Sequence, residues 1–357
     1  MNAPRNERPL RSAVLHLGER RLATRHGEFD LHLFRDLAQA RIAMVLARGD
    51  IDGPEPLLAR VHSSCLTSEC LGGCDCDCAE QLDRALARID EAGRGVLVYL
   101  MQEGRGAGLS AKARDRMLVQ ASGNRITTFD AYAEMGLPAD LRRYDAVASI
   151  FAMLGVCGPL RLLTNNPEKV AAVARALESE KIEVEAALPV AGDDSPWNRD
   201  YLRAKRISGH ALTRADRTPG ARPPERVVAF EPVELAGDPA RLVTASYFLP
   251  VALSGEVHWL RTSVLVDRAS GRESIVLSRG AWRGPEAMAR PDPSQAIALS
   301  LLDRLPVVSA PGREALAHAL QALVATGAGC VGVAWDETAA PAESATRSGT
   351  PRSDAAC

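Results

Sequence analysis

The chain has 357 residues, enough for two or three domains of ordinary size. Its 43 basic and 45 acidic residues nearly cancel, so the net charge of −2 excludes a strongly basic nucleic-acid coat and a polyacidic protein. Aromatic residues make up only 4% of the chain, which argues against stacking platforms for single-stranded nucleic acid. We therefore expect a globular protein that binds no nucleic acid.

The first residues, 1–11, are polar and contain no apolar core of a secretory signal. The longest apolar stretch, around 146–157, is shorter than the roughly 20 residues that a membrane-spanning helix needs. We therefore expect no membrane span and a cytoplasmic location. In that compartment the eight cysteines are expected to be thiols or metal ligands rather than disulfides.

Apolar patterning predicts strands and helices that alternate through the first two hundred residues. The expected strands are 57–62, 96–101, 160–163 and 182–190. The expected helices are 80–93, 109–119, 140–154 and 167–177. Asn166 suits the N-cap of the last helix and Pro167 its first turn. The pattern predicts a mixed α/β or α+β catalytic domain over residues 1–212.

A Pro, Gly and Arg-rich segment, 213–226, has the composition of a linker. After it we expect a small α+β accessory domain of unknown role at 227–335. Its expected strands are 227–235, 243–253, 257–266, 274–278 and 331–334, and its expected helices are 294–305 and 313–326. The Ala, Ser, Thr and Pro-rich tail, 336–357, is expected to be disordered.

Five of the eight cysteines fall between Cys65 and Cys78, which indicates a metal site. In the C-x-C-x-C run that ends at Cys78, alternation along an extended backbone puts the thiols on one face. Zinc prefers tetrahedral thiolate or imidazole ligands, with three protein ligands in catalytic sites and four in structural ones. Spacing alone leaves the ligand set open. His62 is either a further ligand or a histidine that only makes a hydrogen bond at the end of its strand.

Two strand-to-helix turns could hold phosphates. The Gly-rich segment 103–108 follows the strand at 96–101, and segment 164–169 follows the strand at 160–163. Backbone N–H groups at a helix N-terminus favour anions, and Lys169 would add a positive charge. Each turn alone is a weak signal, because ordinary capped turns have the same composition.

Several segments together resemble one family. They are Arg60-Val-His-Ser63, Cys65-Leu-Thr, Cys76-Asp-Cys78, Gln102-Glu-Gly-Arg105, Asp140-Leu-Arg142, Leu162-Leu-Thr-Asn-Asn-Pro-Glu-Lys169 and Gly209-His210. In this order and spacing they resemble GTP cyclohydrolase II, which opens the imidazole ring of GTP. The resemblance covers residues 12–212 and implies a cyclohydrolase II-like core, with the second domain outside it.

The resemblance implies a catalytic zinc on Cys65, Cys76 and Cys78, with Cys70 and Cys74 spare. It places nucleotide contacts at Arg60, Val61, His62, Ser63, Ser64, Gln81, Glu103, Gly104, Arg105, Thr128, Thr164 and Lys169. It implies that Asp140 accepts a proton and that Arg142 acts at the α-phosphate. It also implies a nucleoside triphosphate substrate accompanied by Mg²⁺, and a homodimer.

Three positions depart from the family pattern: Ser64 replaces a glutamate, Asp75 an arginine and Arg116 a tyrosine. A guanidinium stays protonated at neutral pH and cannot replace a phenol in proton transfer. Four interpretations therefore remain. The first is the ordinary reaction on GTP, releasing formate and diphosphate, and the second is ring opening of GTP that stops at the formamidopyrimidine. The third is ring opening of a uridine nucleotide, UTP or UMP, as in uracil-catabolic relatives. The fourth is a non-catalytic, zinc-stabilised nucleotide-binding regulator.

Overall fold

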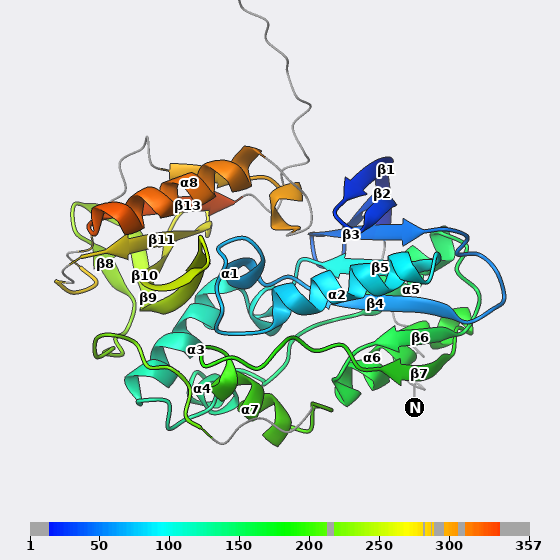
Figure 1. Ribbon diagram of the computed structural model, residues 1–357, viewed down its shortest axis with the longest axis horizontal. Helices are drawn as coiled ribbons and strands as arrows, with labels where there is room; N and C mark the ends of the chain where they lie inside the picture. Colours follow the sequence, from blue (N-terminus) through cyan, green and yellow to red (C-terminus); the bar gives the residue numbers. More distant parts are fainter. Residues whose placement is uncertain are drawn as a thin grey trace, which may run out of the picture.

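The computed structural model describes residues 14–212, 218–280, 283–286, 288, 296–305 and 311–335, and it contains two β-sheets (Figure 1). Part of the expected linker, 213–217, and the expected tail, 336–357, lie outside the described residues. None of the helices in the described ranges combines the length and apolar character needed to cross a lipid bilayer.

The first sheet has seven strands in the order β1-β2-β3-β5-β4-β6-β7. Their bounds are β1 (Val14–Thr24), β2 (Gly27–Asp36), β3 (Arg41–Arg48), β4 (Leu57–Ser63), β5 (Gly95–Leu100), β6 (Leu160–Leu163) and β7 (Val184–Leu188). The pairs from β1 to β5 are antiparallel, whereas β5, β4, β6 and β7 are parallel neighbours. The parallel half carries helical crossovers, as such strands require.

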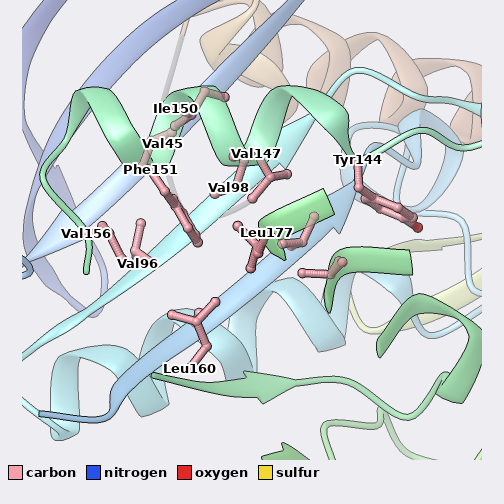
Figure 2. Packing of buried hydrophobic residues seen from close by; sticks show 14 of the residues in the cluster. Val45, Val96, Val98, Tyr144, Val147, Ile150, Phe151, Val156, Leu160 and Leu177 are labelled. Carbon is pink, nitrogen blue, oxygen red and sulfur yellow. The ribbon is translucent and has the colours of Figure 1, made fainter. Parts of the chain in front are cut away.

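Helices cover both faces of this sheet. Side chains alternate along β5, so Val96 and Val98 join one apolar cluster while Leu97 and Tyr99 join another. The first cluster is closed by α5 (Asp145–Met153) and α6 (Pro167–Leu177), as Figure 2 shows for Val147, Ile150 and Phe151. The second is closed by α2 (Cys78–Glu91), whose Leu82, Leu86 and Ile89 recur at helical spacing.

The second sheet has six strands in the order β12-β13-β11-β10-β9-β8. Their bounds are β8 (Val233–Leu235), β9 (Asp238–Leu253), β10 (Glu256–Asp267), β11 (Glu273–Arg279), β12 (Ala296–Leu299) and β13 (Gly329–Trp335). Helix α8 (Pro311–Thr326) packs on it through Leu316, Leu320 and Leu323. The unit is therefore α+β, as its sequence pattern indicates.

Helix α3 (Leu109–Ala121) belongs to the first unit but packs against the second sheet (Figure 1). Its Leu109, Ala113 and Met117 share an apolar cluster with residues of β9, β10 and α8. Burial of side chains as large as Leu109 and Met117 contributes about 2 kcal/mol each. The Glu273 carboxylate of β11 also accepts the backbone N–H groups of Leu109, at 3.1 Å, and Ser110, at 2.9 Å. The second unit therefore fixes the start of α3.

The remaining short elements connect these layers. They are α1 (Leu66–Glu69), η1 (Gly104–Gly106), α4 (Thr128–Glu134), η2 (Glu178–Glu180), α7 (Arg199–Ile207) and η4 (Leu302–Arg304).

Three sequence-based expectations about elements need correction. The helix expected at 140–154 begins only at Asp145, because residues 139–144 form a loop. In place of the helix expected at 294–305 the structure has β12 and the turn η4, with residues 294–295 outside the described part. The strand expected at 227–235 is confined to β8.

Candidate active site

The candidate site lies where the parallel strands β4, β5 and β6 end. In open parallel sheets the loops that follow the carboxyl ends of the strands form the usual ligand crevice. Here the loop after β4 leads to the cysteines, the loop after β5 is the Gly-rich turn, and the loop after β6 leads into α6. Three segments distant in sequence therefore meet at one edge.

Three thiols gather between the end of β4 and the first residue of α2. The Sγ atoms of Cys65, Cys76 and Cys78 lie within 4.8 Å of one another, and those of Cys65 and Cys76 are 3.6 Å apart. All three cysteines are free of disulfides. Thiolates about 2.3 Å from a tetrahedral zinc would be about 3.8 Å apart, so the spacing suits such an ion. The three thiols could therefore bind a metal.

The other two cysteines of the segment lie outside this group. The Cys70 thiol donates to the Asp303 carbonyl at 3.4 Å, and the Cys74 thiol donates to the Gly72 carbonyl at 3.5 Å. His62 is also engaged elsewhere, because its Nε2 lies 2.7 Å from Glu69 Oε1. Its ring stacks on the Tyr99 ring with centroids 5.6 Å apart. The geometry matches the hydrogen-bonding alternative for His62.

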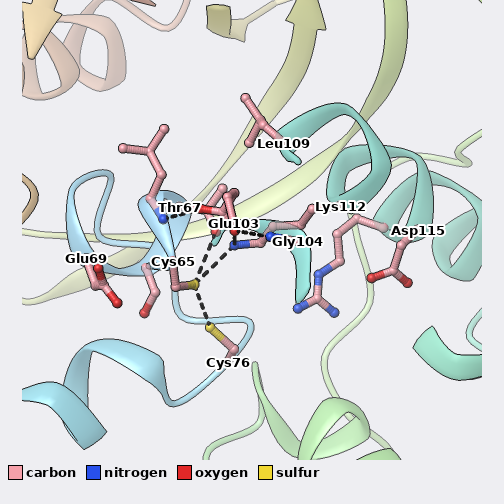
Figure 3. Close-up of polar contacts among 12 residues, drawn as sticks. Cys65, Thr67, Glu69, Cys76, Glu103, Gly104, Leu109, Lys112 and Asp115 are labelled. Atoms are coloured by element: carbon pink, nitrogen blue, oxygen red, sulfur yellow. Dashed lines mark hydrogen bonds and ion pairs between the residues drawn. The ribbon is translucent and has the colours of Figure 1, made fainter. Parts of the chain in front are cut away.

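Lys112 is a buried cation in direct contact with the thiol group (Figure 3). Its Nζ lies 3.1 Å from Cys65 Sγ and 2.9 Å from Glu103 Oε1. Burial opposes its charge, but the neighbouring cysteines and Glu103 raise the pKa of Lys112 well above its ordinary value. Glu103 in turn accepts the Leu66 N–H at 2.6 Å and the Gly104 N–H at 2.9 Å. The Gly-rich turn is thereby tied to the cysteine loop.

Two of the three departures from the family pattern form one buried ion pair. Arg116 Nε lies 2.9 Å from Asp75 Oδ2, and these side chains are only 11% and 13% exposed. The Arg116 guanidinium also lies over the Tyr201 ring, 4.6 Å from its centroid. Arg116 follows Lys112 by one helical turn and shares its face of α3, while Arg114 points elsewhere and donates to the Phe230 carbonyl at 3.3 Å. The sequence shows that Asp75 and Arg116 are unusual, but only the structure shows that their side chains are in contact.

A cavity of about 210 Å³ adjoins the thiols and is rich in cations. Arg60, Arg142 and Lys169 line it. Burial, followed by the charges of Arg142 and Arg60, lowers the pKa of Lys169 well below its ordinary value. Its Nζ donates to the Val61 carbonyl at 3.0 Å. Burial lowers even the pKa of Arg60, to about 10. Such clustering of cations favours an anionic ligand.

Asp140 and Arg142 form an ion pair in the loop before α5. Arg142 Nε lies 2.9 Å from Asp140 Oδ1, and the Arg142 backbone N–H donates to the same oxygen at 2.9 Å. Burial alone would raise the pKa of Asp140, but the Arg142 hydrogen bonds and charge lower it. The loop also packs closely on the Gly-rich turn, because a Cβ on Gly106 would lie 2.8 Å from the Leu141 carbonyl. A regular helix over 140–142 would have separated the two side chains.

Nearly all the residues that the sequence assigned to the site line one of two adjoining cavities. The cation-rich cavity is lined by Arg60, His62, Ser63, Cys78, Gln81, Arg105, Asp140, Arg142, Thr164 and Lys169. The smaller one, about 80 Å³, is lined by Ser63, Ser64, Cys65, Cys76, Cys78, Glu103, Gly104, Arg105, Arg116, Thr128 and Arg142. Val61 is the exception, because its side chain is buried in the core and only its carbonyl faces Lys169.

Two site residues on α7, Tyr201 and Lys205, were not predicted from the sequence, and His210 was singled out only as part of the motif Gly209-His210. Tyr201 lines both cavities, and Lys205, one turn later, lines the larger one. Lys205 also pairs with the buried Asp77 at 2.8 Å. His210 lines the larger cavity too, where burial and then the nearby cations lower its pKa to about 4. The i, i+4 spacing of Tyr201 and Lys205 was the available signal, but it also fits an exposed basic helix.

Comparisons with known proteins match the first unit. A sequence model of the family described as GTP cyclohydrolase II matches residues 16–189. The chain is 37% identical over 202 residues to "GTP cyclohydrolase-2" of Shewanella frigidimarina, covering 56% of this chain and 96% of that protein. It is 42% identical over 201 residues to the Pseudomonas aeruginosa protein of that name, covering 56% and 94%. It is 37% identical over 196 residues to "Riboflavin biosynthesis protein RibBA" of Cytophaga hutchinsonii, but spans only 46% of that relative's length.

Proposed function

The chain belongs to the GTP cyclohydrolase II family, and we propose that it opens the imidazole ring of GTP by hydrolysis. The observation that carries this proposal is that a three-thiol group and a cation-rich cavity adjoin each other. Ser63, Cys78 and Arg105 line both cavities, as do Arg142 and Tyr201. A nucleotide with its phosphates among the cations could therefore present its base to the thiol group.

We propose that Cys65, Cys76 and Cys78 hold zinc, because their spacing and free thiols suit that ion. When bound, zinc supplies Lewis-acid chemistry towards water and towards negative charge that develops on the base. Lys112, 3.1 Å from Cys65 Sγ, offsets part of the negative charge of three thiolates. Glu103 keeps Lys112 in place from the other side.

The proposed triphosphate site uses Arg60, Arg142 and Lys169, with Mg²⁺ accompanying the phosphates. Arg60 is already fixed by hydrogen bonds to the Leu163 carbonyl, at 2.7 Å, and Gln81 Oε1, at 2.8 Å. Helix α6 begins beside this cavity, so its N-terminal dipole also favours an anion. Burial and then repulsion from Arg142 and Arg60 lower the pKa of Lys169, and a bound anion would offset that repulsion.

Phosphate binding would also change the state of Asp140. In the structure Arg142 is paired with Asp140, and that pairing lowers the basicity of the carboxylate. A phosphate that attracts Arg142 would weaken this pair and raise the pKa of Asp140, making it a better proton acceptor. We therefore propose that Asp140 accepts a proton during ring opening only after Arg142 has turned to the nucleotide.

A uridine nucleotide is the second candidate substrate, and the Arg116–Asp75 pair favours it. Arg116 supplies hydrogen-bond donors and a fixed charge where the family has a phenol, and a uracil ring needs only one hydrolysis to open. The charge would stabilise an oxyanion that develops on either ring. It would not support removal of formate from an opened purine, because a guanidinium stays protonated near neutral pH and cannot accept a proton.

A mass-spectrometric screen of GTP, GDP, UTP and UMP tests the proposed function on the zinc-loaded full chain. We expect GTP to gain the mass of water or to lose formate. Cys76→Ser should abolish this turnover, because a three-ligand site cannot spare a ligand. Cys74→Ser is the matched control, since the Cys74 thiol lies outside the group and a serine can also donate to the Gly72 carbonyl.

Two results would count against the proposal. Turnover that survives equally in Cys76→Ser and in Cys74→Ser would exclude chemistry at the thiol group. Intact GTP after incubation with zinc-loaded protein, with UTP or UMP consumed instead, would replace GTP by the uridine candidate.

A further inference from the structure

A second group of metal-binding side chains lies on the first hairpin, on other strands than the cysteines. His16 and Glu19 of β1 and His32 of β2 each place one ligand atom within 4.8 Å of the other two. We propose that these three side chains form a second divalent-metal site, for Zn²⁺ or a neighbouring transition-metal ion. This site is independent of the nucleotide chemistry proposed above.

A β-bulge creates the group. Residues three apart on a regular strand point to opposite faces, so His16 and Glu19 should not meet. The register of β1 on β2 shifts between His16 and Gly18, and the extra residue restores the two side chains to one face. Gly18 has φ +151°, which a residue with a side chain rarely adopts. Glu19 then lies directly opposite His32.

Packing holds the two imidazoles in place. The His16 ring packs on the Phe34 ring, with centroids 4.8 Å apart, and Phe34 is fully buried. The rings of His16 and His32 have centroids 5.5 Å apart, and the His32 side chain is only 13% exposed. The Glu19 side chain is 65% exposed and can adjust. The half-buried His32, the exposed His16 that packs on Phe34, and the adjustable Glu19 carboxylate suit capture of an ion from solution.

One of the three ligand atoms, His32 Nδ1, is buried without a hydrogen-bond partner among the described residues. His32 Nδ1 lies 3.1 Å from Glu19 Oε2 but outside hydrogen-bond geometry, and it has no hydrogen-bond partner in the described part of the chain. A metal ion between the two atoms would satisfy both. Zinc ligands about 2.0–2.1 Å from the ion lie about 3.3 Å apart, so a small movement of Glu19 would close the site.

The donor set selects the class of ion. Two imidazoles and one carboxylate suit Zn²⁺, Ni²⁺, Cu²⁺ and related ions, whereas Ca²⁺ and Mg²⁺ prefer oxygen ligands alone. Three protein ligands leave at least one position for water. Because β1 is an edge strand of the first sheet, the ion would link that edge to β2 across the bulge.

Calorimetric titration with ZnCl₂ tests the site on full-length protein that already holds one zinc per chain. We expect a second equivalent to bind to the wild type. His16→Ala and His32→Ala should each weaken the second event roughly tenfold or more, because each removes a direct ligand. His258→Ala is the matched control. His258 faces a carboxylate, Glu256, at 3.7 Å, but belongs to no three-ligand group among the described residues.

Hydrogen exchange gives a readout that does not depend on calorimetry. Zinc should slow exchange of the β1 amides in the wild type but not in His32→Ala. Glu19→Gln guards against misfolding, because it alters an exposed side chain that packs in no core, and it should also weaken the second event. The proposal would be overturned if the wild type, already loaded with one zinc, bound no second equivalent. It would also be overturned if His16→Ala, His32→Ala and Glu19→Gln all bound the second equivalent as tightly as the wild type.

Discussion

The ion pair of Arg116 and Asp75 allows a sharp test of the departure from the family pattern that the resemblance implies. Arg116→Tyr introduces the tyrosine that the resemblance to the family implies for this position of α3. Alone, it leaves the Asp75 carboxylate only 13% exposed and without the guanidinium 2.9 Å away. Breaking such a pair from one side costs about 3–5 kcal/mol in buried sites, and the residual exposure here places the expected loss near 3 kcal/mol.

A double-mutant cycle measures the pair directly. Asp75→Asn alone leaves a buried guanidinium, whereas Asp75→Asn with Arg116→Tyr leaves neither charge. We expect each single variant to lose about 3 kcal/mol of unfolding free energy in urea titrations, and the double variant to lose clearly less than the sum. Losses that add up, or a single Arg116→Tyr variant as stable as the wild type, would refute the pairing argument.

The same double variant tests the chemistry. Wild type should open the ring of GTP and retain the formyl group, because Arg116 cannot relay a proton. The double variant, with a phenol beside the thiol group and no unpaired charge, should release more formate per GTP. Proton NMR of the reaction mixture measures formate and formamide together. If the wild type releases one formate per GTP and the double variant releases the same amount, Arg116 does not control formate release.

Glu273, Arg142 and His210 each allow a further test. Glu273→Ala should lower the unfolding free energy by about 1 kcal/mol, because it uncaps α3, and an unchanged urea midpoint would contradict this; exposed Glu256→Ala is the control. Arg142→Ala should move the acid limb of the pH profile for ring opening to higher pH, because Arg142 lowers the pKa of Asp140 and its loss lets the carboxylate become protonated at a higher pH. An acid limb that does not move would exclude Asp140 as the base. Nucleotide binding should be accompanied by proton uptake at His210, because a nearby phosphate will raise its pKa from about 4. Nucleotide affinity should therefore increase more steeply between pH 7 and pH 5 in the wild type than in His210→Gln, and an equal dependence of affinity on pH in the two proteins would exclude His210 from the anion site.

Local patterns predicted the elements that surround the site. The buried strand before the Gly-rich turn and the Asn166–Pro167 helix start are both found, because each depends on neighbouring residues alone. The three strands β1, β2 and β3 were not predicted. In β1 the bulge beside Gly18 breaks the two-residue alternation of apolar and polar residues. Nearly all residues of β1 are exposed and several are charged, so its sequence lacks the apolar pattern of a strand.

Contacts between segments that are distant in the sequence could not be predicted from local patterns. Leu109, Ala113 and Met117 are spaced like a helix face that packs in its own domain, yet they pack on the second sheet. The boundary at residue 212 therefore remains a prediction, and α3 is where a shortened chain would expose apolar surface. Asp140 likewise suits an N-cap position, and only the loop geometry shows it paired with Arg142.

The most direct test of the account is the fate of ring carbon 8 of GTP. GTP labelled with carbon-13 at that position should be incubated with zinc-loaded wild type and followed by carbon NMR. We expect the label to leave the purine ring and to appear either in the formamide group of the opened nucleotide or in free formate. Label that stays in intact purine, under conditions where the protein holds its zinc and binds the nucleotide, would contradict the proposed ring opening.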